Sequence, residues 1–94
     1  MIIVSGAIRL KPGQRDRFLS ASARAIEAGR KAPGCRAFVV AADPIEADVA
    51  NVYEEWDDEK DLLKFRGDGP NQDLRAMIAS ANVRRHEIAK SSPA

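Results

Sequence analysis

The sequence is poor in the residues that build metal centres and disulfide frameworks. Its 94 residues include one cysteine, Cys35, and one histidine, His86. A single cysteine cannot form an internal disulfide, and these two residues lie too far apart in the sequence to give the ligand spacing of a metal site. Phosphate-binding glycine loops and paired-carboxylate acid–base motifs are also missing. We therefore predict a protein that holds no metal and no bound cofactor.

The chain also lacks an excess of either charge sign and any long apolar run. The 15 basic and 14 acidic residues leave a formal charge of +1, whereas nucleic-acid-binding proteins concentrate basic residues on one face. No apolar run approaches the roughly 18 residues that cross a bilayer. Residues 1–6 also lack the basic region of a signal peptide. These absences predict a cytoplasmic protein with no nucleic-acid or membrane partner.

What the sequence does contain is a regular succession of strand and helix patterns. Residues 2–10 alternate as a strand whose stronger core face carries Ile2, Val4, Gly6, Ile8 and Leu10. Next come a helix to about residue 32, strands at 35–42 and 48–56, and a short helix to about residue 66. After a break at 67–70, a helix restarts at Pro70 or Asn71 and carries an apolar stripe of Leu74, Met77, Ile78 and Ala81. A strand at 82–88 comes last.

This order predicts an α+β fold. Strand, helix, strand, strand, helix pair and strand form the βαββαβ arrangement of a ferredoxin-like domain, with one four-stranded antiparallel sheet and the helices on one face. The domain is expected to span residues 1–89. Residues 90–94 have nothing to bury and are predicted to form a disordered tail.

The second face of the predicted sheet is also apolar in places. Strand 35–42 has hardly a polar residue after Arg36, and Ile3 and Ala7 lie on the second face of the first strand. A strand that is apolar on both faces is covered on both faces, and soluble monomers rarely expose a large apolar patch. We therefore predict a homodimer whose subunits pack sheet against sheet.

The strand 48–56 ends in Trp56, the one tryptophan, and the acidic residues behind it suit the start of a helix. The indole ring can fill the core or form the wall of a ligand pocket, and both alternatives stay open at this point. The long helix carries the small residues Ser22, Ala25 and Gly29, which bring its backbone close to the sheet or leave space beneath it. We predict a cavity there for a small aromatic molecule, bordered by Trp56 with some of Phe18, Phe65 and Met77.

A few other side chains have chemistry that an active site uses. An imidazole ordinarily titrates near neutral pH, so His86 could act as a base, although an exposed strand residue is the commoner case. Arg9, Arg84 and Arg85 could stabilise a phenolate or lie on a solvated strand face, and the sequence leaves open which residues of the last strand point inward. Cys35 is interpreted as a small thiol that is buried or half-buried.

Three segments carry a family resemblance: Lys11-Pro12-Gly13, Ala32-Pro33-Gly34-Cys35, and Val52-Tyr53-Glu54-Glu55-Trp56 with Asp57 and Leu62 behind it. Over residues 1–89 the chain resembles the antibiotic biosynthesis monooxygenase family of dimeric α+β barrels. The resemblance implies a cofactor-independent monooxygenase acting on a planar phenolic, quinol or polyketide-like aromatic compound, and it singles out Trp56. The alternative is a non-catalytic dimeric module that binds a small molecule on the same fold, since fold alone does not settle activity.

Two positions depart from the haem-degrading relatives of this family. Those enzymes resemble one another in a histidine on the short helix and in an asparagine on the helix-facing side of the first strand. Here the two neighbourhoods hold Phe65 and Gly6, so we predict no haem degradation. An asparagine near the tryptophan is implicated in the aromatic-oxidising relatives. Asn51 lies an odd number of positions before Trp56, on the opposite side of a strand, and only Trp56 is assigned a role.

Overall fold

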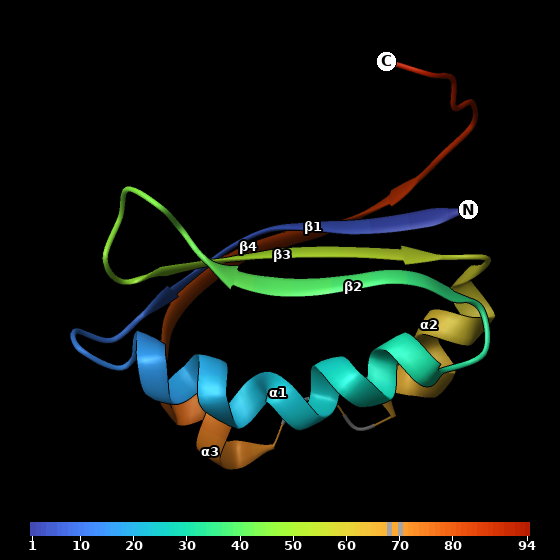
Figure 1. Cartoon of the computed structure of the whole chain (residues 1–94). Coiled ribbons are helices and arrows are strands. Elements are labelled where there is room, and N and C mark those ends of the chain that lie inside the picture. The colour runs from blue at the N-terminus through green and yellow to red at the C-terminus, as the bar shows by residue number, and fades with distance from the viewer. Residues whose placement is uncertain (68, 70) are drawn as a thin grey trace.

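The computed structural model describes residues 1–67, 69 and 71–94. Its elements are, in chain order, β1 (Ile2–Leu10), α1 (Arg15–Lys31), β2 (Cys35–Ala42), β3 (Val49–Trp56), α2 (Glu59–Arg66), α3 (Gln72–Ala76) and β4 (Ile78–Glu87). The strands form one antiparallel sheet in the order β2-β3-β1-β4, and α1, α2 and α3 lie on one side of it (Figure 1). The predicted ferredoxin-like α+β fold is confirmed.

The strand register decides which side chains face the helices. On β1 the buried residues are Ile2, Val4 and Leu10, so the even-numbered positions form the helix-side face, as the sequence predicts. Pairing places Trp56 beside Ile2 and Glu54 beside Val4. The rows continue across the sheet, so the helix-side face also includes Phe38, Val40, Ala50, Val52, Ala81, Val83 and Arg85.

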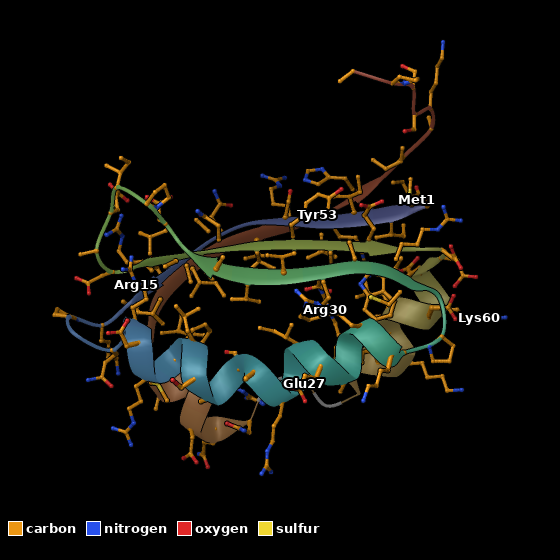
Figure 2. The ribbon with its side chains drawn as sticks, viewed as in Figure 1. Met1, Arg15, Glu27, Arg30, Tyr53 and Lys60 are labelled. Carbon is orange, nitrogen blue, oxygen red and sulfur yellow. The ribbon has the colours of Figure 1, made fainter. Side chains whose placement is uncertain are left out.

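The opposite side of the sheet, here called the open face, has no helix of the described chain over it (Figure 1). Its residues are Ile3, Ser5, Ala7, Arg9, Ala37, Val39, Ala41, Asn51, Tyr53, Glu55, Ser80, Asn82, Arg84 and His86. Tyr53 points away from α1 (Figure 2). Val39 and Tyr53 are cross-strand neighbours and keep 40 % and 38 % of their surface exposed.

The core between the sheet and the helices consists of two clusters. The first contains Ile2, Val4, Phe38, Trp56 and Leu62, and the second contains Leu10, Phe18, Ala50, Leu74 and Met77. Helix α1 packs closely on β2, because a Cβ atom at Gly29 would lie 2.6 Å from the ring of Phe38. At Gly29 the small residue therefore serves close approach and leaves no space beneath the helix. Ala25, expected on the buried stripe, is exposed.

Side chains from both sides of the sheet hold the loop between β2 and β3. From the helix side, Arg15 Nη1 donates hydrogen bonds to the carbonyl oxygens of Glu46 at 2.9 Å and Asp43 at 3.2 Å. From the open side, Asn51 Nδ2 donates to Asp43 Oδ1 at 2.8 Å. Hydrogen bonds from the Glu46 N–H, the Asn51 side chain and the Ile45 N–H lower the pKa of the Asp43 carboxyl. This network fixes the position of the loop.

The same loop rises on the side of the sheet away from the helices (Figure 1). Arg9, an open-face residue of β1, contacts it through an ion pair with Glu46 at 3.1 Å. Within the loop, Ile45 is 88 % exposed. Three of the large hydrophobic residues that stay exposed, Val39, Tyr53 and Ile45, therefore lie on or beside the open face.

The boundary between α3 and β4 differs from the sequence prediction. The apolar spacing predicts a helix through Ala81 and a last strand at 82–88, but α3 ends at Ala76 and β4 begins at Ile78. Ile78 pairs with Leu10, and Ala81 pairs with Ile8. Pairing with β1 thus replaces the last expected turn of helix.

The helix starts follow ordinary capping chemistry. Asp58 accepts a hydrogen bond from the Asp61 N–H at the start of α2, and Asn71 accepts one from the Leu74 N–H at the start of α3. Asp68 and Pro70 of the predicted break lie outside the described residues. Residues 88–94 contain no helix or strand. In the described part of the chain, every helix is too short or too polar to cross a membrane.

Candidate functional site

Three aromatic rings gather where β3 ends, and we call Phe38, Trp56 and Phe65 the aromatic cluster. The ring centroids of Trp56 and Phe65 are 5.4 Å apart, and those of Phe38 and Phe65 are 5.5 Å apart. Trp56 is fully buried, while Phe65 on α2 is half-buried. Because α2 starts soon after β3 ends, it packs back on the end of the strand and brings Phe65 to the indole ring.

The four residues predicted to border a cavity divide into two groups. Trp56 and Phe65 belong to the aromatic cluster, whereas Phe18 and Met77 pack with Leu10 in the second core cluster. Two open surface hollows lie elsewhere, one of about 520 Å³ that includes Met77 in its lining and one of about 430 Å³ beside the start of β1. Neither is lined by Trp56, Phe18 or Phe65. A ligand cavity beside Trp56 stays a prediction.

Glu54 lies beside Trp56 on the helix-side face of β3, since residues two apart on a strand share a face. It is buried, and within the described residues the only other buried polar side chain is Ser22. The indole Nε1–H of Trp56 donates a hydrogen bond to Glu54 Oε1 at 2.9 Å. Burial raises the pKa of the Glu54 carboxyl, and the Trp56 hydrogen bond and the charge of Arg66 lower it by less.

The two carboxylate oxygens of Glu54 differ in their partners. Oε2 accepts no hydrogen bond from any described residue. Among the described residues, Arg15 Nε is the one fully enclosed side-chain nitrogen or oxygen atom that lacks a hydrogen-bond partner. Glu54 Oε2 also lacks a partner but is not in this class, so it is not fully enclosed. A carboxylate with one oxygen anchored and the other reachable can accept a proton from a bound molecule.

The helix-side face next to Glu54 is less well covered toward the edge strand β4. We call this area the floor, formed by Gly6, Ile8, Ala81, Val83 and Arg85. Ala81 and Arg85 are exposed, and the other three are half-buried. Gly6 has a φ of 150°, and a Cβ atom there would overlap the carbonyl oxygen of Asn82. The floor is therefore flat at its centre.

The other polar candidates lie on both faces of the sheet. Arg84, His86 and Arg9 lie on the open face, while Arg85 points to the helix side and pairs with Glu59 at 3.1 Å. Asn51 also lies on the open face, opposite Trp56, as predicted.

Cys35 is a half-buried thiol, as predicted, and burial raises its pKa. Among the described residues, no three His, Cys, Asp or Glu side chains come together as ligands for a metal ion.

Glu54 is the residue that the sequence reasoning missed. The signal was present, because Glu54 stands between Val52 and Trp56 at the same parity of a strand, where a core-facing position holds an ionisable group. A buried carboxyl of this kind is uncommon unless it has a partner or a task.

Comparison with known families and structures agrees with this fold. Residues 1–76 match the model of the antibiotic biosynthesis monooxygenase family. A candidate antibiotic biosynthesis monooxygenase from Chloroflexus aurantiacus J-10-fl shares 26% identity, covers 98% of this chain and 96% of its own, and has a TM-score of 0.75. No curated protein matches the sequence.

Two further solved structures share the fold at lower identity. A candidate family member from Deinococcus radiodurans has a TM-score of 0.83 at 13% identity, covering 100% of this chain and 98% of its own. Another from Nitrosomonas europaea has a TM-score of 0.81 at 15% identity, covering 96% of this chain and 100% of its own. Because the family match covers most of the chain, this protein belongs to the antibiotic biosynthesis monooxygenase family.

Proposed function

We propose that the protein is a cofactor-independent monooxygenase that acts on a planar phenolic, quinol or polyketide-like aromatic compound. Family membership supports a general monooxygenase-like role. The observation that carries the finer proposal is the buried Glu54–Trp56 pair, set among aromatic rings beside a flat floor. Apolar walls with a few placed polar groups are typical of small-molecule sites.

The proposed chemistry needs no external reductant. A quinol that takes up one oxygen atom becomes a hydroxyquinone, and the second oxygen atom leaves as water. All the electrons that reduce O₂ come from the quinol itself. The protein contributes an apolar environment, the orientation of the ring and the loss of a proton that makes the substrate electron-rich.

In this proposal the substrate ring lies over the floor. The backbone at Gly6 offers no side chain, so a planar ring can approach the sheet closely there. Trp56 and Phe65 border the ring on one side, and Phe18 with Met77 border the far end. Phe65 and Gly6 stand where the haem-degrading relatives resemble one another in polar side chains, and we expect no haem degradation.

We also propose that the working protein is a cytoplasmic homodimer. A second copy packed on the open face would cover Val39 and Tyr53, which a single chain leaves exposed. The dimeric barrel implied by the family resemblance has the same arrangement. A chain of this size buries a modest share of its surface alone, so a second subunit adds core.

Replacing Trp56 by phenylalanine tests the assignment of the site. We expect the rate of oxygen consumption with 1,4-naphthohydroquinone to fall steeply, with a much smaller loss in the free energy of unfolding. The reason is that the indole anchors Glu54 and borders the substrate ring. The measurements are kcat, KM and the urea midpoint of the same variant. Full burial of Trp56 favours the alternative in which the indole ring only fills the core. In that case the variant loses about 1 to 3 kcal/mol of stability, with aromatic-ligand affinity and turnover unchanged.

A further inference from the structure

We propose that Glu54 is the catalytic proton acceptor of this protein, taking the phenolic proton of the substrate through its Oε2 atom. This inference rests on the proposed oxygenase function, since that reaction begins with the loss of a substrate proton. It assigns to Glu54 a role that goes beyond packing in the core.

The hydrogen bond from Trp56 fixes how Glu54 is presented. An indole N–H can only donate, so the bond of 2.9 Å requires Glu54 Oε1 to accept. The bond holds the carboxylate in one orientation and leaves the lone pairs of Oε2 unused. Among the described residues Oε2 has no hydrogen-bond donor and is not fully enclosed, and we propose that the substrate reaches it there.

The surroundings make Glu54 a stronger base than an exposed glutamate. Burial disfavours its charged form and raises its pKa, which reduces the free-energy difference for taking a proton from a phenol. The groups that face it electrostatically are Arg66 of α2 and Cys35 of β2. Across Val4 in the same row lies Arg85, which is paired with Glu59. Arg66 can balance the charge whether it resides on Glu54 or on the phenolate.

The proton transfer balances without any further group. The phenolic O–H bond breaks, a bond forms between that hydrogen and Glu54 Oε2, and the electron pair stays on the phenolate oxygen. The phenolate then gives its electrons to O₂: a ring carbon bonds to one oxygen atom and the O–O bond breaks. The leaving oxygen atom takes the proton held by Glu54 and the hydrogen of that ring carbon and departs as water, and the carboxylate is restored.

The other candidate bases lie in the wrong place. His86 is exposed on the open face, on the far side of the sheet from the aromatic cluster. Glu55 follows Glu54 in sequence but also points to the open face, where it is half-buried. Glu55 therefore provides a matched control, with the same side chain on the same strand and the opposite orientation.

The test compares the wild-type protein with Glu54→Gln, Glu54→Asp and Glu55→Gln, after circular dichroism shows that each is folded. With 1,4-naphthohydroquinone and O₂, we expect Glu54→Gln to lower kcat about 10²- to 10⁴-fold with little change in KM. It should also remove the acidic limb of the pH–rate profile. Glu54→Asp should keep part of the activity, and Glu55→Gln should match the wild type. Wild-type kcat and pH profile in Glu54→Gln would overturn the inference.

A second readout requires no turnover. At a pH below the pKa of free 4-nitrophenol, the wild type and Glu55→Gln should bind it with the absorbance of the phenolate, and Glu54→Gln should not. Identical spectra for the wild type and Glu54→Gln contradict a proton-accepting Glu54. A wild type that shows the phenolate band but never consumes O₂ would overturn the oxygenase function alone, so the two failures can be told apart.

Discussion

Glu54 occupies a core position at a cost in stability that its neighbours offset only in part. Burial raises its pKa, and the Trp56 hydrogen bond and the charge of Arg66 act in the opposite direction with smaller effect. A carboxyl whose pKa is higher in the folded chain takes up protons on folding between its unfolded and folded pKa values. Its contribution to stability is therefore present at acidic pH and lost as the pH rises.

The stability of the wild type relative to Glu54→Gln should therefore depend on pH. Below the ordinary glutamate pKa of 4.5, both side chains are neutral and the wild type keeps the full contribution. As the pH rises through the folded pKa, the wild type should lose free energy of unfolding relative to the variant. Urea unfolding of both proteins across this range gives the difference. A difference that stays constant, or that grows in favour of the wild type at higher pH, contradicts the prediction.

A second residue-scale prediction concerns Gly29. Replacing it by alanine adds a methyl group against the ring of Phe38, and overpacking of this kind costs about 1 to 3 kcal/mol. The gain from alanine within a helix is smaller, at about 0.5 to 1 kcal/mol. We expect Gly29→Ala to destabilise the wild type but to stabilise a Phe38→Leu background, where the ring is gone. Equal effects in the two backgrounds, measured by urea unfolding, would show that the contact is unimportant.

Some residue assignments could be predicted from the sequence, and others depended on distance along a helix. Trp56 and Phe65 meet because a short turn joins their elements. Phe18 shares the stripe of α1 with Gly29, but roughly three turns separate them along the axis, which is about 16 Å. Phe18 therefore packs at the other end of the core, with Met77. A helical stripe predicts a shared face without predicting a shared site.

At the scale of elements, local spacing and long-range pairing competed at the start of β4. Leu74, Met77, Ile78 and Ala81 have helical spacing, and this predicted a longer helix. Ile78 and the residues after it pair instead with β1, which buries that edge of the sheet core. The strands 2–10 and 35–42 were predictable because their alternation and turn residues agreed with the pairing. The α3–β4 boundary was not, since partners distant in sequence decided it.

Arg15 offers a test of how one helix holds a distant loop. Arg15→Met removes the hydrogen bonds to the carbonyl oxygens of Asp43 and Glu46. We expect a loss of about 1 kcal/mol, the typical net value of a hydrogen bond, because the bond to Asp43 is partly buried and the bond to Glu46 is exposed. Amide hydrogen exchange should quicken in residues 43–48 and stay unchanged in β1. Arg17→Met, an exposed position on the same helix, is the control. Unchanged exchange in the loop of Arg15→Met would mean that Asn51 and Arg9 hold it alone.

For the whole molecule, the distribution of exposed apolar residues is uneven. Val39, Tyr53 and Ile45 all lie on or beside the open face, while the helix side contributes Leu63 of α2. A patch that gathers on one side, next to a loop fixed in position, is typical of a surface that another protein covers. This asymmetry supports the proposed homodimer more directly than composition does.

The dimer proposal predicts a selective effect of charge. Val39→Asp should dissociate or unfold the dimer, because an unpaired carboxylate buried between two sheets is strongly disfavoured. Ala23→Asp places the same charge at an exposed position on α1 and should leave the dimer intact. Sedimentation equilibrium at micromolar concentration measures both. A compact wild-type monomer sinks the proposal, as does a Val39→Asp dimer of unchanged affinity.

The close contact at Gly6 also limits how this chain can diverge. Any side chain at position 6 would meet the carbonyl oxygen of Asn82, and its backbone angle suits few residues other than glycine. A single substitution there would push β4 from β1 before it could add a group to the floor. Val83 and Ala81 lie on an edge strand and can change more freely. Adaptation to a new ligand would therefore proceed through β4.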